Sequence, residues 1–228
     1  MNALENKLIS LYQSPVPILD ASIPMGSYVP IDLSTDNPHL KTLDITNPDI
    51  CQSYIDEVLV ECGGHIAYGG YMEKRDLYSD KVSFSNPTEA SRNIHLGIDY
   101  WCQAHTKVLT PVNGTVHSFK NNSTVGDYGP TIILSHEVDS NLFYTLYGHL
   151  SLTSLEGLAV GKSFNQGEIL GSLGTPDINV NYAPHLHFQI IRDIKDYFGD
   201  YPGVCSQETL SFYRENCPDP NLLLKIES

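Results

Sequence analysis

The second half of the chain alternates apolar and polar positions in short runs separated by turn residues. The candidate strands are residues 94–100, 107–109, 114–119, 131–136, 142–149, 169–173 and 185–191. Glycine, proline, asparagine and aspartate mark the turns between them, as at Asn113-Gly114 and Pro176-Asp177. Short strands joined closely by such turns pair in antiparallel fashion. The pattern therefore predicts a mainly β fold (α+β), built on an antiparallel sheet.

Helical periodicity is confined to short segments. In residues 2–12, Leu4, Leu8 and Leu11 share one helical face, and the prolines that follow end the helix. A second helix begins at Thr46 or Asn47, with Pro48 at its first position, and ends at the glycine pair 63–64. A third, short helix is expected near residues 207–215.

The segments between the first two helices and the strands are predicted to be irregular. Six prolines within residues 15–48 indicate an extended, irregular path. Residues 63–70 are rich in glycine but lack the Gly-Lys-Ser/Thr of a phosphate-binding loop, so they are predicted to form turns.

Composition and charge exclude some classes of function. A formal net charge of -14 argues against nucleic acid as a partner, because phosphate binding needs a cationic surface. The same charge argues against an anionic membrane surface, and no stretch approaches transmembrane length. The five cysteines are scattered and odd in number, so we expect free thiols rather than a disulfide framework.

The first residues carry no sign of a secretory leader. Residues 1–13 include acidic and polar residues and have no continuous apolar run. Together with the free cysteines, this indicates a cytoplasmic protein; the oligomeric state is left open by the sequence.

Three separated pieces place imidazole or carboxylate groups at even spacing within apolar patterns. They are His95-Leu96-Gly97-Ile98-Asp99, Tyr147-Gly148-His149-Leu150 and His185-Leu186-His187-Phe188. Even spacing in a strand puts side chains on one face, so His95 should share a face with Asp99, and His185 with His187. Two neighbouring buried imidazoles need polar partners. Three nitrogen or oxygen ligands with one open position form the pattern of a catalytic zinc site.

In this chain order, the three pieces resemble the motifs of the lysostaphin/LytM-type zinc metalloendopeptidases. That family has His-x-x-x-Asp, then Tyr-x-His-Leu, then His-x-His-Phe. The intervening segments are also similar, at residues 108–116, 129–133 and 170–174. The resemblance covers residues 93–191, and its motifs are specific as a set.

The resemblance implies a role for each residue. It implies that His95, Asp99 and His187 are ligands of a Zn²⁺ cofactor, and that His149 and His185 are the two catalytic histidines. Which of these two is the general base and which stabilises the oxyanion is left open. The fold implied is an antiparallel β-sheet or sandwich with the site in a groove, flanked by short helices.

The chain departs from the wall-cutting members of this family in three segments. Residues 175–184, before His-x-His, form a longer and more apolar turn than the usual short one. The flanks at residues 127–130 and 200–204 resemble a subgroup whose peptidase-like module lies between phosphotransferase-like and aminotransferase-like domains in fusion proteins. These departures bear on the shape of the groove and on the choice of substrate.

Three regions are expected along the chain. Residues 1–90 are predicted to be a helical, proline-rich N-terminal extension that packs on the core, 91–195 the LytM-like core, and 196–228 a C-terminal extension. The N-terminal extension is long enough to lie over the groove, where an Asn, Asp or His could take the open metal position. Simple packing on the core is the preferred interpretation.

The sequence thus favours a zinc metalloendopeptidase that hydrolyses peptide bonds through metal-activated water. Its expected substrate is a peptide of the peptidoglycan or glycine-containing type. Two alternatives stay open: a non-catalytic LytM-like module that binds a partner in the groove, and a metal-dependent amidase acting on a small metabolite.

Overall fold

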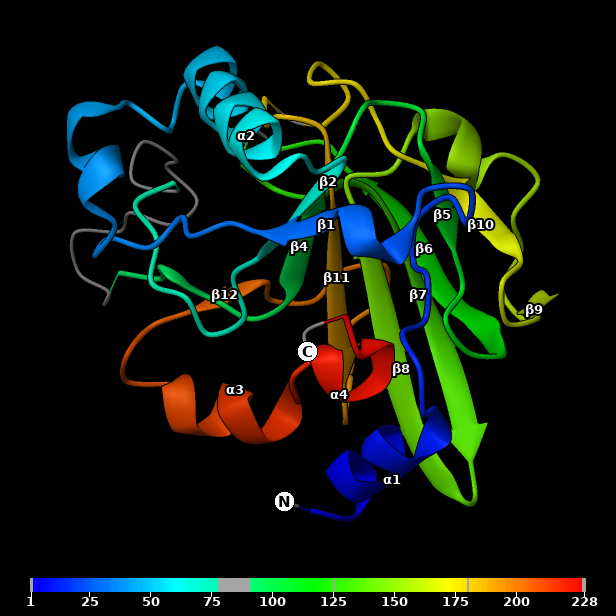
Figure 1. Cartoon of the computed structure of the whole chain (residues 1–228). Coiled ribbons are helices and arrows are strands. Elements are labelled where there is room, and N and C mark those ends of the chain that lie inside the picture. Colours follow the sequence, from blue (N-terminus) through cyan, green and yellow to red (C-terminus); the bar gives the residue numbers. More distant parts are fainter. Residues whose placement is uncertain (1, 78–90, 125, 180, 227–228) are drawn as a thin grey trace.

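One eight-stranded sheet dominates the computed structural model, which describes residues 2–77, 91–124, 126–179 and 181–226 (Figure 1). The strands lie in the order β1-β2-β4-β11-β8-β7-β6-β9. They are β1 (Tyr28–Pro30), β2 (Ile66–Gly69), β4 (Ile98–Trp101), β11 (His185–Ile191), β8 (Asn141–Gly148), β7 (Gly129–Val138), β6 (Gly114–Asn122) and β9 (Ser163–Phe164). Apart from the parallel β1–β2 pair, all neighbours are antiparallel. The predicted mainly β fold is confirmed.

Two small sheets flank the large one. β5 (Lys107–Leu109) pairs with β10 (Ile169–Ser172), and β3 (Ile94–His95) pairs with β12 (Val204–Cys205), both antiparallel. The predicted strand 94–100 is therefore divided into β3 and β4, with Leu96 and Gly97 between them. This division allows the chain to leave one small sheet and enter the large one within a few residues.

The register at the middle of the sheet determines where the polar side chains lie. β11 runs between β4 and β8, and His187 is paired with Asp99 on one side and Gly148 on the other. Each strand alternates its side chains between the two faces. Pairing directly across the sheet therefore puts His187 and Asp99 on the same face and close together.

The two faces of the sheet pack against different parts of the chain. On one face, Leu186, Phe188 and Ile190 of β11 join a core that includes Leu8 near the N-terminus and Leu224 near the C-terminus. On the other face, apolar side chains form two separate clusters, one around Trp101 and the other around Ile191. His185, His187 and Gln189 alternate with the first set on β11 and so point to this second face.

The helices agree with the periodicity of the sequence. α1 (Ala3–Leu11) begins after a capping box formed by Asn2 and Glu5, and buries Leu4 and Leu8. α2 (Pro48–Cys62) has Asn47 as its N-cap and Pro48 in its first turn, as expected. α3 (Leu210–Asn216) matches the short C-terminal helix, while α4 (Asn221–Leu224) had no clear sequence signal. None of the described helices combines the length and apolar character needed to cross a bilayer.

The prediction of turns at residues 63–70 is wrong in its second half. Ile66–Gly69 forms β2, which pairs with β4 on one side and β1 on the other. Four residues flanked by glycines carry too little alternation for a strand to be identified, and the pairing with β4 supplies the missing hydrogen bonds. β1 was likewise hidden within the proline-rich segment.

The N-terminal residues are tied to the sheet at several points. Besides β1 and β2, α1 lies beside α4 at one end of the molecule (Figure 1). The backbone N–H of Val16 donates to the carbonyl of Leu224 at 2.8 Å. The three-region division at residues 90/91 and 195/196 stays a prediction, and residues 78–90 lie outside the described residues.

Candidate metal centre

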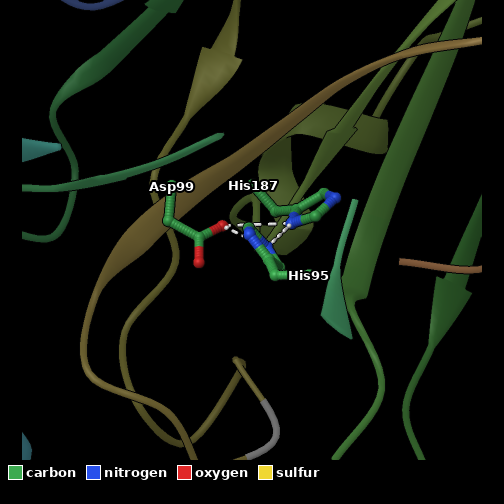
Figure 2. A group of neighbouring side chains, drawn as sticks. All are labelled: His95, Asp99 and His187. Atoms are coloured by element: carbon green, nitrogen blue, oxygen red, sulfur yellow. Dashed lines mark hydrogen bonds and ion pairs between the residues drawn. The ribbon is translucent and has the colours of Figure 1, made fainter. Parts of the chain in front are cut away.

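Three of the predicted residues converge on one point of the second sheet face. Asp99 comes from β4, His187 from β11 and His95 from the end of β3, and each offers a ligand atom within 4.8 Å of the others (Figure 2). All three side chains are buried. Gly97, between β3 and β4, allows this approach: a Cβ there would lie 2.8 Å from Cε1 of His187.

The three ligand atoms are in direct contact. Nε2 of His95 lies 2.9 Å from Nδ1 of His187 and 3.2 Å from Oδ1 of Asp99. Nδ1 of His187 lies 3.0 Å from the same carboxylate oxygen. Tetrahedral zinc sites with bonds of about 2.0–2.1 Å hold their ligand atoms about 3.3 Å apart. The cluster has nearly this spacing.

The outer partners of the two histidines determine their tautomers. Nδ1 of His95 lies 2.9 Å from the carbonyl oxygen of Gly70, which can only accept, so the proton is on Nδ1. Nε2 of His187 lies 2.9 Å from Oε1 of Gln189. The amide nitrogen of Gln189 donates to the carbonyl of Pro202 at 3.2 Å, which orients Oε1 toward His187. Both histidines therefore turn an unprotonated nitrogen toward the centre.

This arrangement fits a divalent metal. Two nitrogen lone pairs and one carboxylate oxygen face one another in a buried space, where they repel unless a cation lies between them. Imidazole and carboxylate are ligands that zinc accepts, and each histidine makes the outer hydrogen bond typical of a metal ligand. The group His95, Asp99 and His187 could therefore bind a metal.

Burial and charge keep the ligands in the protonation states that a metal needs. Burial lowers the pKa of His95 to about 4, so the ring is neutral at pH 7. For Asp99, burial by itself would raise the pKa, but His95 and the Arg75 guanidinium hold the pKa of this carboxyl well below its usual range. The carboxylate is thus ionised and the imidazole is neutral.

The other two predicted residues lie beside the cluster without joining it. The rings of His149, just after β8, and His185, at the start of β11, are 4.1 Å apart between centroids. Nδ1 of His185 donates to the carbonyl of Ala183 at 2.7 Å, which leaves its Nε2 unprotonated. Nδ1 of His149 is buried and has no hydrogen-bond partner among the described residues.

Burial sets the charge of this pair as well. Burial, followed by the nearness of His185, lowers the pKa of His149 well below its usual value. Burial also lowers the pKa of His185, although Asp99 opposes this. Both rings are therefore neutral near pH 7 and able to accept a proton.

All five residues line one pocket of about 290 Å³. Its walls also include the aromatic rings of Tyr128, Tyr182, Tyr197 and Tyr201 and the charged side chains of Arg92, Asp127 and Asp200. Burial, together with the nearby Asp200, raises the pKa of Asp127. The pocket thus joins the ligand cluster and the histidine pair to a half-open space lined by aromatic and charged groups.

The N-terminal extension reaches the pocket at the end of its described part, residues 2–77. Within described residues 2–77, Leu77 is the one that lines the pocket, and the metal-ligand group found in the described chain contains no residue before His95. The remainder of the extension, residues 78–90, lies outside the described residues. Within the described part, β1 pairs in the sheet and Leu8 joins its core.

Some groups at the site were missed by sequence reasoning. Gln189 continues the even spacing of His185 and His187, and this signal could have identified it. Arg75 and Glu73 carry no such signal, because Arg75 reaches Asp99 from a loop distant in sequence and Glu73 contacts Asp99 only through Arg75. His136 is buried, its Nδ1 lies 2.8 Å from the carbonyl oxygen of Asn113, and it is not among the residues that line the pocket. All five cysteines are free, as expected, although Cys62 is exposed.

Fold and site together define a mainly β protein with a buried His–Asp–His group that could hold a divalent metal, next to a pair of neutral imidazoles. Residues 93–197 match the family model described as Peptidase family M23. The matched segment contains all five candidate residues and spans a little under half of the chain. The M23 match supports a metallopeptidase. It does not show the resemblance to the fusion-protein subgroup. No curated protein matches the chain.

Several solved structures are similar to part of the chain. The catalytic domain of the antimicrobial peptidase lysostaphin from Staphylococcus simulans is 23% identical, over 54% of this chain and 80% of that chain, with a TM-score of 0.37. A catalytic domain of a prophage-encoded M23 protein from Enterococcus faecalis is 22% identical, over 48% and 76%, with a TM-score of 0.36. A zinc-containing peptidase from Vibrio cholerae is 21% identical, over 46% and 31%, with a TM-score of 0.35.

Proposed function

We propose that this protein is a zinc-dependent metallopeptidase that hydrolyses peptide bonds. The observation that carries the proposal is the convergence of three unprotonated ligand atoms, from His95, Asp99 and His187, on one buried point beside two neutral imidazoles. The M23 family match over residues 93–197 supports the same function. Peptides of the peptidoglycan or glycine-containing type are the proposed substrates.

In this proposal, His95, Asp99 and His187 hold the zinc. When bound there, zinc would supply a Lewis acid and lower the pKa of a water ligand to about 7. The remaining steps belong to the chain itself. The peptide lies in the pocket. His149 or His185 accepts, at an unprotonated ring nitrogen, the proton that the attacking water loses, and delivers it to the amine that leaves as the peptide C–N bond breaks. The other imidazole donates toward the oxyanion; for His185 this would need a proton on Nε2, because its Nδ1 proton is engaged by the carbonyl of Ala183.

The burial of the two imidazoles supports this role. A neutral histidine near pH 7 can take up a proton, and a buried one is close enough to a dry reaction centre to give it back to the substrate. A structural role alone would not require an imidazole nitrogen of His149 to lie buried at the pocket wall without a hydrogen-bond partner among the described residues.

Hydrolysis of defined peptides tests the proposal. Purified full-length protein would be incubated with glycine peptides, D-amino-acid peptides and isolated sacculi, with and without a chelator, and then with zinc restored. We expect cleavage that the chelator abolishes and zinc restores. Replacing His149 or His185 by Ala should slow cleavage by about 10²–10⁴-fold for the residue that acts as general base. His39→Ala, which removes an exposed imidazole, is the matched control.

The result also separates the alternatives. A folded protein that binds zinc but cleaves none of these peptides contradicts the peptidase. Release of ammonia or an amine from small amides would then favour the amidase. A protein that binds no metal, yet captures peptides in the pocket, would favour the non-catalytic binding module.

A further inference from the structure

A short segment outside the M23-matched region runs alongside β3. Residues 70–75 hydrogen-bond through the backbone to residues 93–95: Met72 N–H donates to His95 at 2.9 Å, and Arg75 N–H donates to Asn93 at 2.9 Å. In return, the N–H of His95 donates to the carbonyl of Glu73 at 2.9 Å. The backbone of the metal-ligand candidate His95 is therefore held on this edge by residues 70–75, which precede the matched segment 93–197.

The same segment contacts two of the ligand side chains directly. The carbonyl of Gly70 accepts the Nδ1 proton of His95 at 2.9 Å, and Nη1 of Arg75 donates to Oδ2 of Asp99 at 2.5 Å. Gly70 has a φ of +105°, and a Cβ there would lie 1.8 Å from Nη2 of Arg75. Glycine is therefore required if Arg75 and His95 are to occupy these positions.

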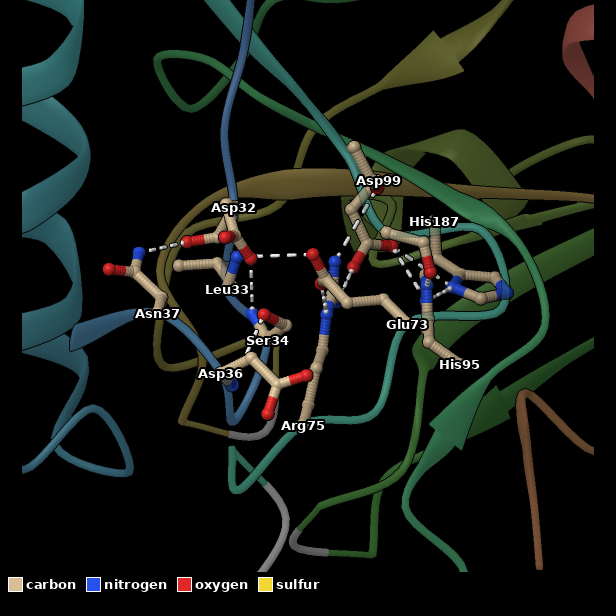
Figure 3. Close-up of polar contacts among 12 residues, drawn as sticks. Asp32, Leu33, Ser34, Asp36, Asn37, Glu73, Arg75, His95, Asp99 and His187 are labelled. Carbon is tan, nitrogen blue, oxygen red and sulfur yellow. Dashed lines mark hydrogen bonds and ion pairs between the residues drawn. The ribbon is translucent and has the colours of Figure 1, made fainter. Parts of the chain in front are cut away.

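Arg75 is itself held in a defined orientation. Its side chain is fully buried, and its guanidinium carbon lies 5.3 Å from the ring centroid of Trp101. Nε donates to Oε2 of Glu73 at 2.5 Å, and Nη2 contacts the carbonyl of Gly69 at 3.4 Å. The other carboxylate oxygen of Glu73 accepts the N–H of Leu33 at 3.2 Å. Figure 3 shows the resulting row of polar groups from Leu33 through Glu73 and Arg75 to Asp99.

Because Oδ2 of Asp99 is engaged by Arg75, only Oδ1 is turned toward His95 and His187. A carboxylate free to rotate could offer both oxygens to a metal and so occupy the position that a substrate or water needs. Arg75 and Glu73 also nearly cancel each other's charge. The main effect of Arg75 on a bound cation is therefore to orient Asp99, rather than to repel the cation.

On these contacts, and resting on the metal site of the proposed function, we propose that Arg75 is a positioning residue that makes Asp99 a one-oxygen metal ligand. Glu73 in turn positions Arg75. The metal centre then extends beyond the M23-matched segment, because residues 70–75 hold two of its three ligands from outside.

Zinc affinity of the full-length protein tests the proposal without requiring activity. Affinity would be measured by competition with a chromophoric chelator for wild type, Arg75→Met, Arg75→Lys and Glu73→Gln. Loss of a partner that orients a metal ligand typically weakens binding 10–100-fold, and we expect this for Arg75→Met. Lysine keeps the charge but lacks the planar fork that contacts Asp99 and Glu73 together, so Arg75→Lys should restore only part of the affinity. Glu73→Gln should weaken binding less than Arg75→Met.

A matched control and a second measurement separate positioning from stability. Arg192→Met removes a half-buried arginine paired with Glu215 at 3.4 Å, remote from the pocket, and should leave zinc affinity unchanged. In the cobalt(II)-substituted protein, release of Oδ2 should raise the coordination number and weaken the visible absorption bands in Arg75→Met. A merely structural arginine would lower the melting temperature without changing zinc affinity or the cobalt spectrum.

Wild-type zinc affinity in a folded Arg75→Met protein would overturn the inference. If that variant does not fold, Arg75→Lys and Glu73→Gln decide: affinities within twofold of wild type in both, with unchanged cobalt bands, also overturn it. These outcomes differ from a failure of the proposed function, in which the wild-type protein itself binds no zinc or binds it and cleaves no peptide.

Discussion

At the scale of single residues, hydrogen bonds on the outer side of the cluster determine which lone pair of each candidate ligand points into it. The carbonyl of Gly70 accepts a hydrogen bond from Nδ1 of His95, and Oε1 of Gln189 accepts one from Nε2 of His187. Arg75 donates a hydrogen bond to one oxygen of Asp99. Each of these contacts leaves a lone pair pointing inward. In the proposed metal site, residues that do not contact the cation would therefore contribute to its affinity.

Removal of His187 should abolish metal binding. His187→Ala deletes the nitrogen that contacts both His95 and Asp99, and two remaining ligands cannot hold zinc tightly. We expect elemental analysis to find about one zinc per wild-type chain and almost none in the variant. The exposed His39→Ala serves as the control. Equal zinc in wild type and His187→Ala would rule out this ligand.

His136 should make the protein less stable in acid. Burial lowers the pKa of His136 to about 4, against 6.5 for an ordinary histidine. Above pH 6.5 the ring is neutral in both states, so its contribution is constant. Between pH 6.5 and about 4 the unfolded chain binds a proton that the folded chain does not. The free energy of unfolding therefore decreases as the pH falls from 6.5 to about 4, and this group accounts for about 3 kcal/mol of that decrease.

Urea unfolding across this pH range measures the effect. His136→Gln removes the titrating ring, so its free energy of unfolding should depend less steeply on pH between 6.5 and 4 than that of the wild type. Both proteins would be treated with chelator, so that loss of metal in acid does not contribute. Parallel curves of stability against pH for the two proteins would contradict the prediction.

At the scale of secondary-structure elements, β11 directs core side chains to one face of the sheet and the side chains of the site to the other, because successive residues alternate between the faces. Leu186, Phe188 and Ile190 pack into the core on one face, while His185, His187 and Gln189 carry the polar groups of the site on the other. The strand is buried on both faces, because helices and loops cover the polar side as well. Packing on the first face therefore sets the position of the site on the second.

α1 should stabilise the fold without affecting the site. Leu8 is fully buried in the core of the opposite sheet face, and α1 packs beside α4 near the β7–β8 end of the sheet (Figure 1). Leu8→Ala should lower the free energy of unfolding by about 2–5 kcal/mol, because it leaves a cavity.

Chemical denaturation and zinc titration measure the two parts of this prediction. The exposed Leu142→Ala is the control, and it should change stability by less than about 0.5 kcal/mol. Zinc affinity should be that of the wild type in both folded variants. A weaker zinc affinity in folded Leu8→Ala would show that α1 acts on the metal centre.

At the scale of the whole molecule, the site unites segments from distant parts of the chain. Its ligands come from β3, β4 and β11, and its outer partners from residues 70–75 and 189. In the unfolded chain these groups are far apart, so a metal held by them would bind only the folded state with high affinity. Metal binding should therefore stabilise the entire fold.

Zinc should raise the melting temperature of the chelator-treated protein. At free zinc 100 times the dissociation constant, the expected stabilisation is about 2.7 kcal/mol. Differential scanning calorimetry at several zinc concentrations would measure it, with His187→Ala as the control that should not respond. A melting temperature independent of zinc in the wild type would contradict a metal site assembled by folding.

Much of the fold was predictable because its signals are local. Alternation identified seven strand regions of the second half, and caps and periodicity identified α1, α2 and α3. β1, β2, β9 and β12 were missed, because strands of two to four residues show too little alternation. Their formation depends on the edges of neighbouring strands, which accept or donate their backbone hydrogen bonds.

The residues of the candidate site were likewise predictable from the sequence only where their signal is local. His185 and His187 were predictable together, because even spacing within one strand places side chains on one face wherever that strand lies. His95, Asp99 and His149 lie on β3, on β4 and just after β8, and they were predicted from the resemblance to the LytM-type motifs. Their roles stay predictions. Arg75 was not predictable: an arginine two residues from a glutamate is usually solvated, and nothing local indicates that this arginine is buried against Asp99.

The sequence by itself determined which residues alternate, where helices begin and end, and which side chains can bind a metal, because these properties depend on neighbours within a few positions. Only the tertiary structure decided that His187 lies opposite Asp99, that His95 reaches both across the β3–β4 division, and that residues 70–75 hold two of the three ligands. Apart from His95 with Asp99, those side-chain contacts join residues 24 or more positions apart. They follow from strand register and from the burial of paired charges, which no local pattern encodes.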